Sequence, residues 1–375
     1  MIYRRFQDKD LSLLGFGAMR LPLLEDKSID QEELNDMVKY ALEHGINYFD
    51  TAYPYHGGKS EIALGEALKA FPRESFYLAD KFPGHQPVEK WDVEGVFKEQ
   101  LDKCQVEYFD FYLLHNISEF SIDTYLDDEL GFVDYFVEQK KQGKIKHLGF
   151  SAHADLDCLK RFVDKYGDVM EFCQIQLNYV DYTLQHAKEK YEYLTEKGIP
   201  VWVMEPLRGG KLKNTAESFR WLQRFDNVKM ILSGMSNMDQ MRENCAIFHA
   251  DDPLSDLDTN GLKLLADKFV KKVPCTGCHY CDGCPMGINI PLLLDITNDA
   301  RTGFSFTVTM KLEGQPEGSR PADCIGCGAC VEKCPQKIDI PGTLKELDEL
   351  WQGMPKWIEI CKQREEAAKK LREGK

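Results

Sequence analysis

Cysteine is the residue type in this chain whose spacing points most directly to chemistry. The chain has 13 cysteines, and eight of them fall between residues 275 and 334. These eight form two groups, Cys275, Cys278, Cys281 and Cys284, and Cys324, Cys327, Cys330 and Cys334. Thiols repeated at such short spacing in a long chain favour metal ligation over disulfide bonds. We expect the five scattered cysteines to be small buried residues.

The second group has the Cys-x2-Cys-x2-Cys-x3-Cys-Pro spacing of bacterial ferredoxins, in which three cysteines surround one 4Fe-4S cluster and the fourth reaches another. The first group is one residue shorter before its last cysteine, and it also ends in proline. The stretch Cys284-Pro-Met-Gly-Ile-Asn-Ile-Pro291 is echoed by Cys334-Pro-Gln-Lys-Ile-Asp-Ile-Pro341, which indicates an internal duplication. The sequence therefore predicts two 4Fe-4S clusters.

The crossing rule of those ferredoxins predicts which cysteines share a cluster. One cluster would be held by Cys275, Cys278, Cys281 and Cys334, and the other by Cys324, Cys327, Cys330 and Cys284. Structural zinc is the alternative, but a zinc site has four ligands and seldom takes three from one tight loop.

A second set of chemically useful residues ends or follows apolar runs. Asp50 closes one run and Tyr55 follows it, Lys81 closes the next run, and His115 closes a third. Taken singly, each residue type has an ordinary structural role, such as a helix cap or a satisfied polar group. All of them lie at or just after the end of an apolar run, so whether they lie together in space depends on how the runs are arranged in the fold.

Eight short β-rich runs alternate with segments of helical periodicity in the first 250 residues. The runs are Leu13–Gly17, Ile46–Asp50, Phe76–Lys81, Phe109–His115, Ile145–Ser151, Phe172–Leu177, Pro200–Glu205 and Val228–Gly234. Helices are expected at Asp30–His44 and Thr124–Gln142, for example, and Gly45, Gly143 and Gly198 stand where helices should stop. This alternation favours a (β/α)8 TIM barrel in the α/β class over an open doubly wound sheet. An open sheet would normally show a third glycine after Gly15 and Gly17, together with a following helix.

The composition changes near residue 250, where a turn-rich acidic link begins. We therefore predict a barrel over residues 1–255 and a small α-helical ferredoxin-like iron–sulfur domain over residues 256–375. Helices are expected at Gly261–Lys272 and Ile290–Arg301. The tail Lys362–Lys375 mixes Glu and Lys at helical spacing, and we expect it to be a solvated helix rather than a partner-binding one.

The residues at the ends of the runs resemble the aldo-keto reductase family, specifically its subgroup with a C-terminal two-cluster domain. The resemblance covers about residues 1–250 and includes Gly15–Pro22, Gln174-Ile-Gln176 and Glu205–Gly210. It implies a catalytic tetrad of Asp50, Tyr55, Lys81 and His115. Tyr55 would give a proton to the developing alkoxide, and the ammonium of Lys81 would lower the pKa of that phenol. Asp50 would keep Lys81 charged, and His115 would orient the carbonyl oxygen.

The resemblance also implies a nicotinamide cofactor, NAD(P)(H). The residues that would hold it are Gly17, Met19, Ser151, Gln174, Arg208, Gly210 and Asn244, with Ser151 and Gln174 at the carboxamide and Arg208 and Gly210 near the pyrophosphate. Ala152 and Met204 depart from the family pattern, which has asparagine and an aromatic residue there. The stretch Ser233–Gln240 lacks the Lys and Arg that commonly bind the 2'-phosphate of NADP, so we expect NAD(H) to be used at least as well.

These features predict an iron–sulfur oxidoreductase that interconverts small carbonyl and alcohol compounds, with electrons exchanged through the clusters or with an external ferredoxin. A hydride carries two electrons and a 4Fe-4S cluster passes one, so a flavin in the barrel mouth stays open as a variant, although no motif supports it. The main alternative is an ordinary NAD(P)H-dependent reductase whose clusters are structural, redox-sensing or partner-docking. A non-catalytic electron carrier is a third reading. The loops Pro83–Trp91 and Ile117–Gly131 are expected to shape the substrate pocket.

Charge and hydropathy restrict the partners. The formal net charge of −15 argues against attraction to nucleic acid or to an anionic membrane surface. The first residues, Met1–Asp10, show no apolar signal segment, and no stretch is apolar over the length of a membrane span. We therefore expect a cytoplasmic protein without nucleic-acid or membrane partners.

Overall fold

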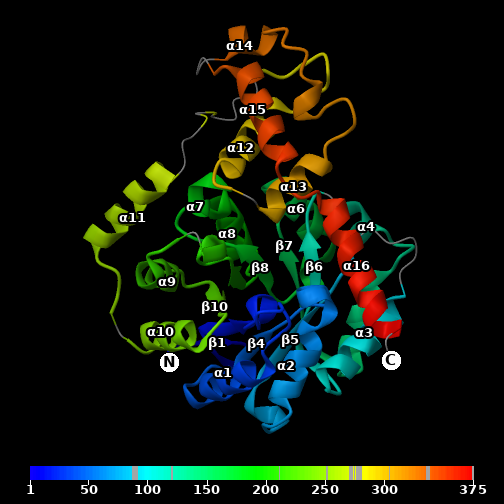
Figure 1. Cartoon of the computed structure of the whole chain (residues 1–375), viewed down its shortest axis with the longest axis vertical. Coiled ribbons are helices and arrows are strands. Elements are labelled where there is room, and N and C mark those ends of the chain that lie inside the picture. The colour runs from blue at the N-terminus through cyan, green and yellow to red at the C-terminus, as the bar shows by residue number, and fades with distance from the viewer. Residues whose placement is uncertain are drawn as a thin grey trace.

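The computed structural model of the chain describes residues 1–86, 92–119, 121–210, 212–250, 252–269, 273, 275, 281–303, 305–334 and 338–373. Figure 1 shows two parts, a barrel formed by the N-terminal residues and a group of helices from the C-terminal residues above it. All eight predicted runs form strands, and the strands close into one barrel. The predicted fold class is therefore confirmed.

Each barrel strand pairs in parallel with its neighbours, in the order β10-β3-β4-β5-β6-β7-β8-β9. The strands are β3 Leu14–Gly17, β4 Tyr48–Asp50, β5 Tyr77–Phe82, β6 Phe109–Ile117, β7 Ile145–Ala152, β8 Cys173–Gln176, β9 Val201–Met204 and β10 Val228–Gly234. Because parallel strands in a closed barrel all end on the same rim, the residues that close these strands are brought together there.

Helices surround the barrel and bury their apolar faces against the strands. They are α1 Gln31–Glu43, α2 Ser60–Leu68, α3 Val93–Cys104, α4 Ile122–Leu126, α5 Phe132–Lys141, α6 Leu156–Tyr166, α7 Asp181–Leu184, α8 Ala187–Glu196, α9 Thr215–Gln223 and α10 Met238–His249. The prediction of a single helix over Thr124–Gln142 was wrong. Helix α4 ends at Leu126 because Asp127 has an extended backbone, and α5 starts again only after Gly131, which is left-handed at φ +58°.

A hairpin that was not predicted covers the opposite end of the barrel. Strands β1 Tyr3–Phe6 and β2 Lys9–Ser12 pair antiparallel. Phe6 is buried and packs edge-on against Trp202 inside the barrel, with ring centroids 5.0 Å apart. The hairpin therefore closes the end away from the strand-ending polar residues and leaves the other rim for function.

The C-terminal region consists of helices around a small apolar core of its own. The helices are α11 Asp256–Phe269, α12 Ile290–Ala300, α13 Phe306–Glu313, α14 Ala329–Lys333, α15 Ile340–Gln352 and α16 Trp357–Glu373. The duplication is visible in α12 and α15, since Asn289 caps the first and Asp339 the second, and each helix has proline in its first turn. Both helices pack into the small core through Leu293 and Leu344.

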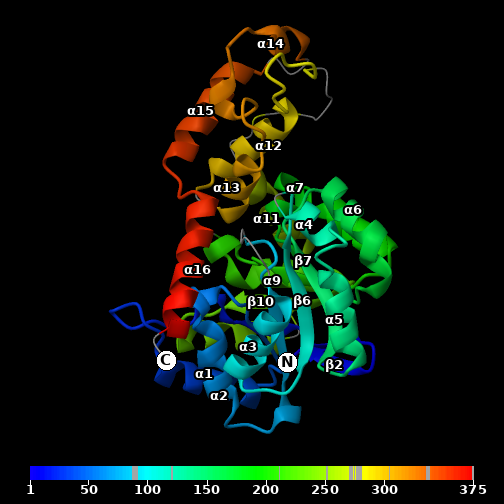
Figure 2. The same ribbon diagram turned by 90° about the vertical axis from the view of Figure 1, so that its right-hand side faces the viewer.

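Helix α16 turns back from the C-terminal region and runs along the barrel (Figure 2). Trp357 and Cys361 are each only 2% exposed, and a Cβ atom added at Gly57 of the barrel would lie 3.4 Å from Ala367. The prediction of a solvated tail helix from Lys362 onward is therefore right only in part. Residues 362–373 are helical and most of their described side chains are exposed, but Arg364 and Ala367 face the barrel. None of the described helices is long and apolar enough to cross a membrane.

Candidate active site and cluster-binding region

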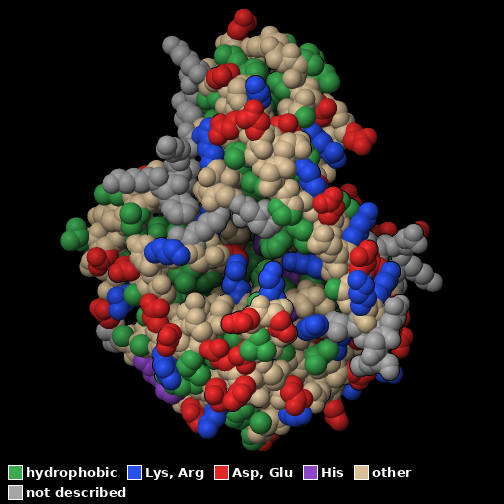
Figure 3. Space-filling model, in the orientation of Figure 1, with side chains coloured by type: hydrophobic (Ala, Val, Ile, Leu, Met, Phe, Trp, Pro, Cys, Tyr) green, Lys and Arg blue, Asp and Glu red, His purple; other side chains and the backbone are tan. Residues whose placement is uncertain are grey.

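A cavity of about 460 Å³ lies at the rim where the barrel strands end. Residues that follow β3 to β10 form most of its wall, and α13 and α16 of the C-terminal region supply the rest through Phe306, Met310, Trp357 and Arg364. Figure 3 shows Lys and Arg side chains gathered around the hollow between the two parts of the molecule. The volume is in the range of small-molecule sites.

The structure brings all four residues of the predicted tetrad to this cavity. Lys81 Nζ forms an ion pair with the carboxylate of Asp50 and donates a hydrogen bond to the carbonyl oxygen of Thr51 at 2.6 Å. The same ammonium lies 5.0 Å from the centre of the Tyr55 ring, whose centroid is 5.9 Å from that of His115. The four side chains therefore form one connected group.

Burial and charge set the protonation of this group. Burial alone would lower the pKa of Lys81, but Asp50 and then Tyr55 outweigh it, so the pKa is raised and the ammonium stays charged. Burial raises the pKa of Tyr55, and Lys81 opposes that shift without cancelling it. The expected lowering by Lys81 is present but is outweighed. Burial, followed by His85 and Lys81, holds the pKa of His115 well below its ordinary value, so its imidazole is neutral.

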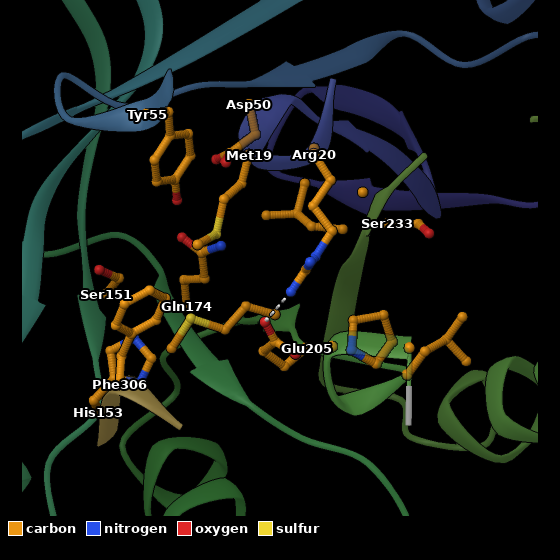
Figure 4. A pocket seen from close by; sticks show the side chains of 18 of the residues that line it. Met19, Arg20, Asp50, Tyr55, Ser151, His153, Gln174, Glu205, Ser233 and Phe306 are labelled. Carbon is orange, nitrogen blue, oxygen red and sulfur yellow. Dashed lines mark ion pairs between the residues drawn. The ribbon is translucent and has the colours of Figure 1, made fainter. Parts of the chain in front are cut away.

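Six of the seven residues predicted to hold the nicotinamide cofactor also line the cavity, namely Gly17, Met19, Ser151, Gln174, Gly210 and Asn244. Gln174 Oε1 is buried without a hydrogen-bond partner among the described residues. A carboxamide N–H is the type of donor that this oxygen lacks. Figure 4 shows Gln174 and Tyr55 directed into the same space. The residues present therefore fit a nicotinamide ring placed beside Tyr55.

Gly17 lets two barrel strands approach closely at this rim. A Cβ atom added there would lie 3.2 Å from the carbonyl oxygen of Ser233, so a side chain would crowd β10. Ser233 in turn accepts a hydrogen bond from Asn244 at 3.0 Å. This contact joins α10 to the strand ends beneath the cavity.

Arg208 is the one predicted cofactor residue that does not line the cavity. Its guanidinium is buried and pairs with Asp181 of α7 at 3.0 Å and with Asp299 of α12 at 3.3 Å. It also donates a hydrogen bond to Thr302. The structure therefore places Arg208 in the contact between the barrel and the C-terminal region.

Several cavity residues were missed by sequence reasoning. His85 lies in the expected loop Pro83–Trp91, of which residues 87–91 lie outside the described residues, but the loop gave no sign that a histidine there faces the cavity. His153 follows β7 directly. The C-terminal contributors carried a signal that was overlooked, since Trp357, Cys361 and Arg364 are spaced four and three residues apart on one face of a helix.

The described motif cysteines gather around the small core of the C-terminal region. Six border it, Cys275, Cys281, Cys284, Cys324, Cys330 and Cys334. Partial burial, followed by the negative charges of Cys324 and Cys327, raises the pKa of Cys330. Gly326 and Gly328, at φ +66° and +76°, let the loop turn tightly between them. Cys278 lies outside the described residues.

This loop fits a multi-iron cluster. Its candidate ligands Cys324, Cys327 and Cys330 are all thiols, the ligand type that holds 4Fe-4S clusters. Within the described ranges, no three His, Cys, Asp or Glu side chains converge on a point that a single metal ion could occupy. The scattered cysteines Cys104, Cys158, Cys173, Cys245 and Cys361 are all buried and unpaired, as expected.

A (β/α)8 barrel whose rim joins a tyrosine, a lysine, an aspartate and a histidine in one cavity is suited to enzymes that transfer a proton to or from a bound substrate. Residues 13–218 match the model of the aldo/keto reductase family, and residues 274–338 match that of a 4Fe-4S dicluster domain. The chain belongs to the aldo/keto reductase family and carries a ferredoxin-type 4Fe-4S domain at its C-terminal side. The predicted family and subgroup are confirmed.

Several relatives are similar to part of this chain. The chain is 27% identical to the probable aldo-keto reductase 1 of Glycine max over 212 residues, which cover 54% of this chain and 58% of that protein. It is 30% identical to L-galactose dehydrogenase of Arabidopsis thaliana over 218 residues, covering 54% and 63%. Both matches span less than two thirds of the relative. Identity to the NADH-specific methylglyoxal reductase of Escherichia coli (strain K12) is 26% over 276 residues, covering 66% and 81%.

Solved structures confirm the barrel fold. The holo form of aldo-keto reductase AKR11C1 from Bacillus halodurans aligns with a TM-score of 0.60 and 23% identity, covering 71% of this chain and 96% of that one. The thermostable aldo-keto reductase Tm1743 aligns with a TM-score of 0.56 and 23% identity, covering 71% and 100%.

Proposed function

We propose that the barrel cavity interconverts small carbonyl compounds and alcohols with a nicotinamide cofactor. One observation carries this proposal. The buried Lys81–Asp50 pair lies beside Tyr55 in a cavity that also contains neutral His115 and the unpartnered Gln174 Oε1. A charged lysine next to a protonated phenol is an arrangement for moving a proton to or from an oxygen atom.

The roles of the residues follow from this geometry. Bound NAD(P)H would supply the hydride, which carries both electrons to the carbonyl carbon. Tyr55 holds the proton that the carbonyl oxygen takes up, so an alcohol is formed. Lys81 stabilises the phenolate that remains, and Asp50 keeps Lys81 charged. Neutral His115 can donate a hydrogen bond that positions the carbonyl oxygen. Ser151 and Gln174 would hold the carboxamide.

We further propose that NAD(H) is used at least as well as NADP(H). Ser236 and Gln240, which line the cavity after β10, carry no charge, and the stretch Ser233–Gln240 has no Lys or Arg. The Escherichia coli relative is named as an NADH-specific methylglyoxal reductase, which agrees with this proposal. The test is kcat/KM for NADH and NADPH with methylglyoxal, and clearly faster turnover with NADPH would contradict it.

The main proposal is tested by measuring whether hydride passes directly from the cofactor to the substrate. The reaction is run without oxygen, with methylglyoxal and nicotinamide cofactor deuterated at C4. We expect the deuterium to appear on carbon in the alcohol product. Turnover without deuterium in the product would contradict direct transfer and would favour a flavin or cluster intermediary. The absorbance of cofactor released from the purified protein shows whether a flavin is present.

A second proposed function is electron exchange between the cavity and two 4Fe-4S clusters, each held by the cysteines assigned above. The observation in its favour is that α13 and α16, which continue from the cluster-binding region, form part of the cavity wall. An external ferredoxin or similar redox protein would then be a partner, in a reducing cytoplasm. The alternative is that the clusters serve structure, sensing or docking only.

Iron analysis and EPR separate these readings. Without oxygen, two clusters predict about eight irons per chain. Electron exchange predicts that NADH reduces them, and that Cys327→Ser removes about four irons and the exchange together. Cys158→Ala, which removes a buried thiol from the barrel helix α6, is the control. Clusters that stay oxidised while methylglyoxal is reduced would contradict exchange and leave the alternative.

A further inference from the structure

Helix α16 brings a cation into the cavity on the side of the tetrad. Arg364 lines the cavity, and its guanidinium carbon lies 5.1 Å from the Phe306 ring centre and 5.7 Å from that of Trp357. Its charge acts on Tyr55 and on His115, which surround the proposed position of the carbonyl oxygen. Arg364 therefore belongs to the substrate side of the cavity, whereas Ser151 and Gln174 mark the nicotinamide side.

This cation has no acidic partner in the described part of the chain. The neighbours that favour its charged form are the Cys361 thiol and the Tyr55 phenol. Neither is an anion at neutral pH, because burial raises the pKa of Cys361 to about 12 and that of Tyr55 above its ordinary value. A largely buried, uncompensated guanidinium is unfavourable on its own, and an anion entering the cavity would relieve that cost.

The surroundings of Arg364 indicate the rest of the ligand. Phe306, Met310 and Trp357 present aromatic and thioether surface to the cavity. The Trp357 indole N–H also lacks an acceptor among the described residues. The planar fork of arginine matches the two oxygens of a carboxylate, and aromatic walls suit an apolar or aromatic body.

We propose that Arg364 binds the carboxylate of the substrate, and that the substrate class is carbonyl compounds, or the matching alcohols, with an aromatic or bulky apolar body and a carboxylate group. The proposal rests on the carbonyl reduction proposed above. It makes Arg364 a specificity-determining residue supplied by the C-terminal region rather than by the barrel. Substrate recognition thereby depends on the docking of α16.

The test compares matched substrates in the full-length protein with its clusters. Benzaldehyde is compared with the 2-, 3- and 4-carboxybenzaldehydes, using NADH without oxygen. At least one carboxybenzaldehyde should have a kcat/KM above that of benzaldehyde. Arg364→Gln should lower the ratio of the two values by about 10- to 100-fold, the effect of losing a charge-assisted contact. The ratio cancels any general effect on turnover. Lys362→Gln removes an exposed cation from the same helix and should leave the ratio unchanged.

Binding gives an independent readout. Calorimetry with benzoate and benzamide, which differ in charge but not in ring, should show tighter binding of benzoate to the wild-type protein, and Arg364→Gln should remove the difference. A benzoate preference that is absent, or that survives in Arg364→Gln, would overturn the inference. If the wild-type protein reduces no aldehyde with either cofactor, the proposed function fails instead. If benzaldehyde is reduced without any carboxylate preference, only the inference fails.

Discussion

The indole of Trp357 stacks on the imidazole of His85, with ring centroids 5.8 Å apart and an angle of 28° between the planes. Trp357 begins the last helix of the chain, and His85 follows the barrel strand β5 that ends near Lys81. The two residues join the C-terminal region to the barrel rim that carries the predicted tetrad. This contact explains how a helix distant in sequence becomes part of the cavity wall.

Trp357→Ala should loosen α16 from the barrel. The substitution removes a side chain that is only 2% exposed and that also packs edge-on against Phe306, and such truncations cost about 3–5 kcal/mol. We expect faster backbone hydrogen exchange along α16 and a higher KM for methylglyoxal. Trp357→Phe, which keeps an aromatic ring against His85, should stay close to wild type. Unchanged exchange in Trp357→Ala would show that α16 is held by other contacts.

Lys81→Met should reduce turnover strongly. The variant removes the charge that stabilises the Tyr55 phenolate, so we expect kcat to fall by about 10²- to 10⁴-fold. Asp110→Asn is the control. Asp110 forms an ion pair with Arg73 at a distance of 2.6 Å, and neither residue lines the cavity. That control should lower thermal stability without a comparable loss of kcat. An equal loss of kcat in both variants would mean that Lys81 acts only through stability.

The pH dependence of reduction follows from the shifted pKa values. The pKa of Tyr55 is raised, so its phenol carries its proton through neutral pH. Burial lowers the pKa of His115 well below its ordinary value, and that of His85 to about 3, so both imidazoles are already neutral there. kcat/KM for reduction should therefore be flat between about pH 6 and 8 and should fall only when Tyr55 loses its proton at alkaline pH. An inflection at about pH 6.5 would contradict this prediction, because it would show that a histidine with an ordinary pKa limits kcat/KM.

Arg208→Gln distinguishes two roles for that arginine. The structure places it between Asp181 and Asp299, so its loss leaves buried carboxylates without a cation. Breaking such a group costs about 3–5 kcal/mol, and hydrogen exchange in α12 should rise. The Kd for NADH should change little. Arg301→Gln is the control, since Arg301 pairs with Glu346 inside the C-terminal region. A large rise in the NADH Kd without faster exchange would restore the pyrophosphate role.

The sequence was sufficient to predict the barrel because each strand is an apolar run, which is a local pattern. The ends of those runs drew attention to Asp50, Lys81 and His115, but their grouping with Tyr55 as a tetrad came from the family resemblance and its catalytic role stays a prediction. The cysteine spacing likewise predicts a cluster-binding region without any tertiary information. In contrast, the hairpin β1–β2 is short, and its Phe6 and Leu11 are buried in a cluster with barrel residues, which local patterning does not reveal.

Contacts between the two parts could not be predicted in the same way. The charged residues from Lys362 onward suggested a solvated helix, yet Trp357, Cys361 and Arg364 face the barrel. The family resemblance predicted that Arg208 binds the pyrophosphate of the cofactor. In the structure its partners are Asp181 and Asp299, which come from different parts of the chain. Such pairings depend on how two surfaces meet, and the sequence of either surface alone does not specify them.

The most direct test of the account is the kcat for NADH-dependent reduction of methylglyoxal by Tyr55→Phe. Tyr48→Phe is the matched control, since it removes another buried phenol oxygen, one with no hydrogen-bond partner among the described residues. We predict that Tyr55→Phe lowers kcat by about 10²- to 10⁴-fold while its Kd for NADH stays near wild type, and that Tyr48→Phe keeps its activity. A Tyr55→Phe variant that turns over at the wild-type rate would contradict the assignment of this cavity as the reductase site.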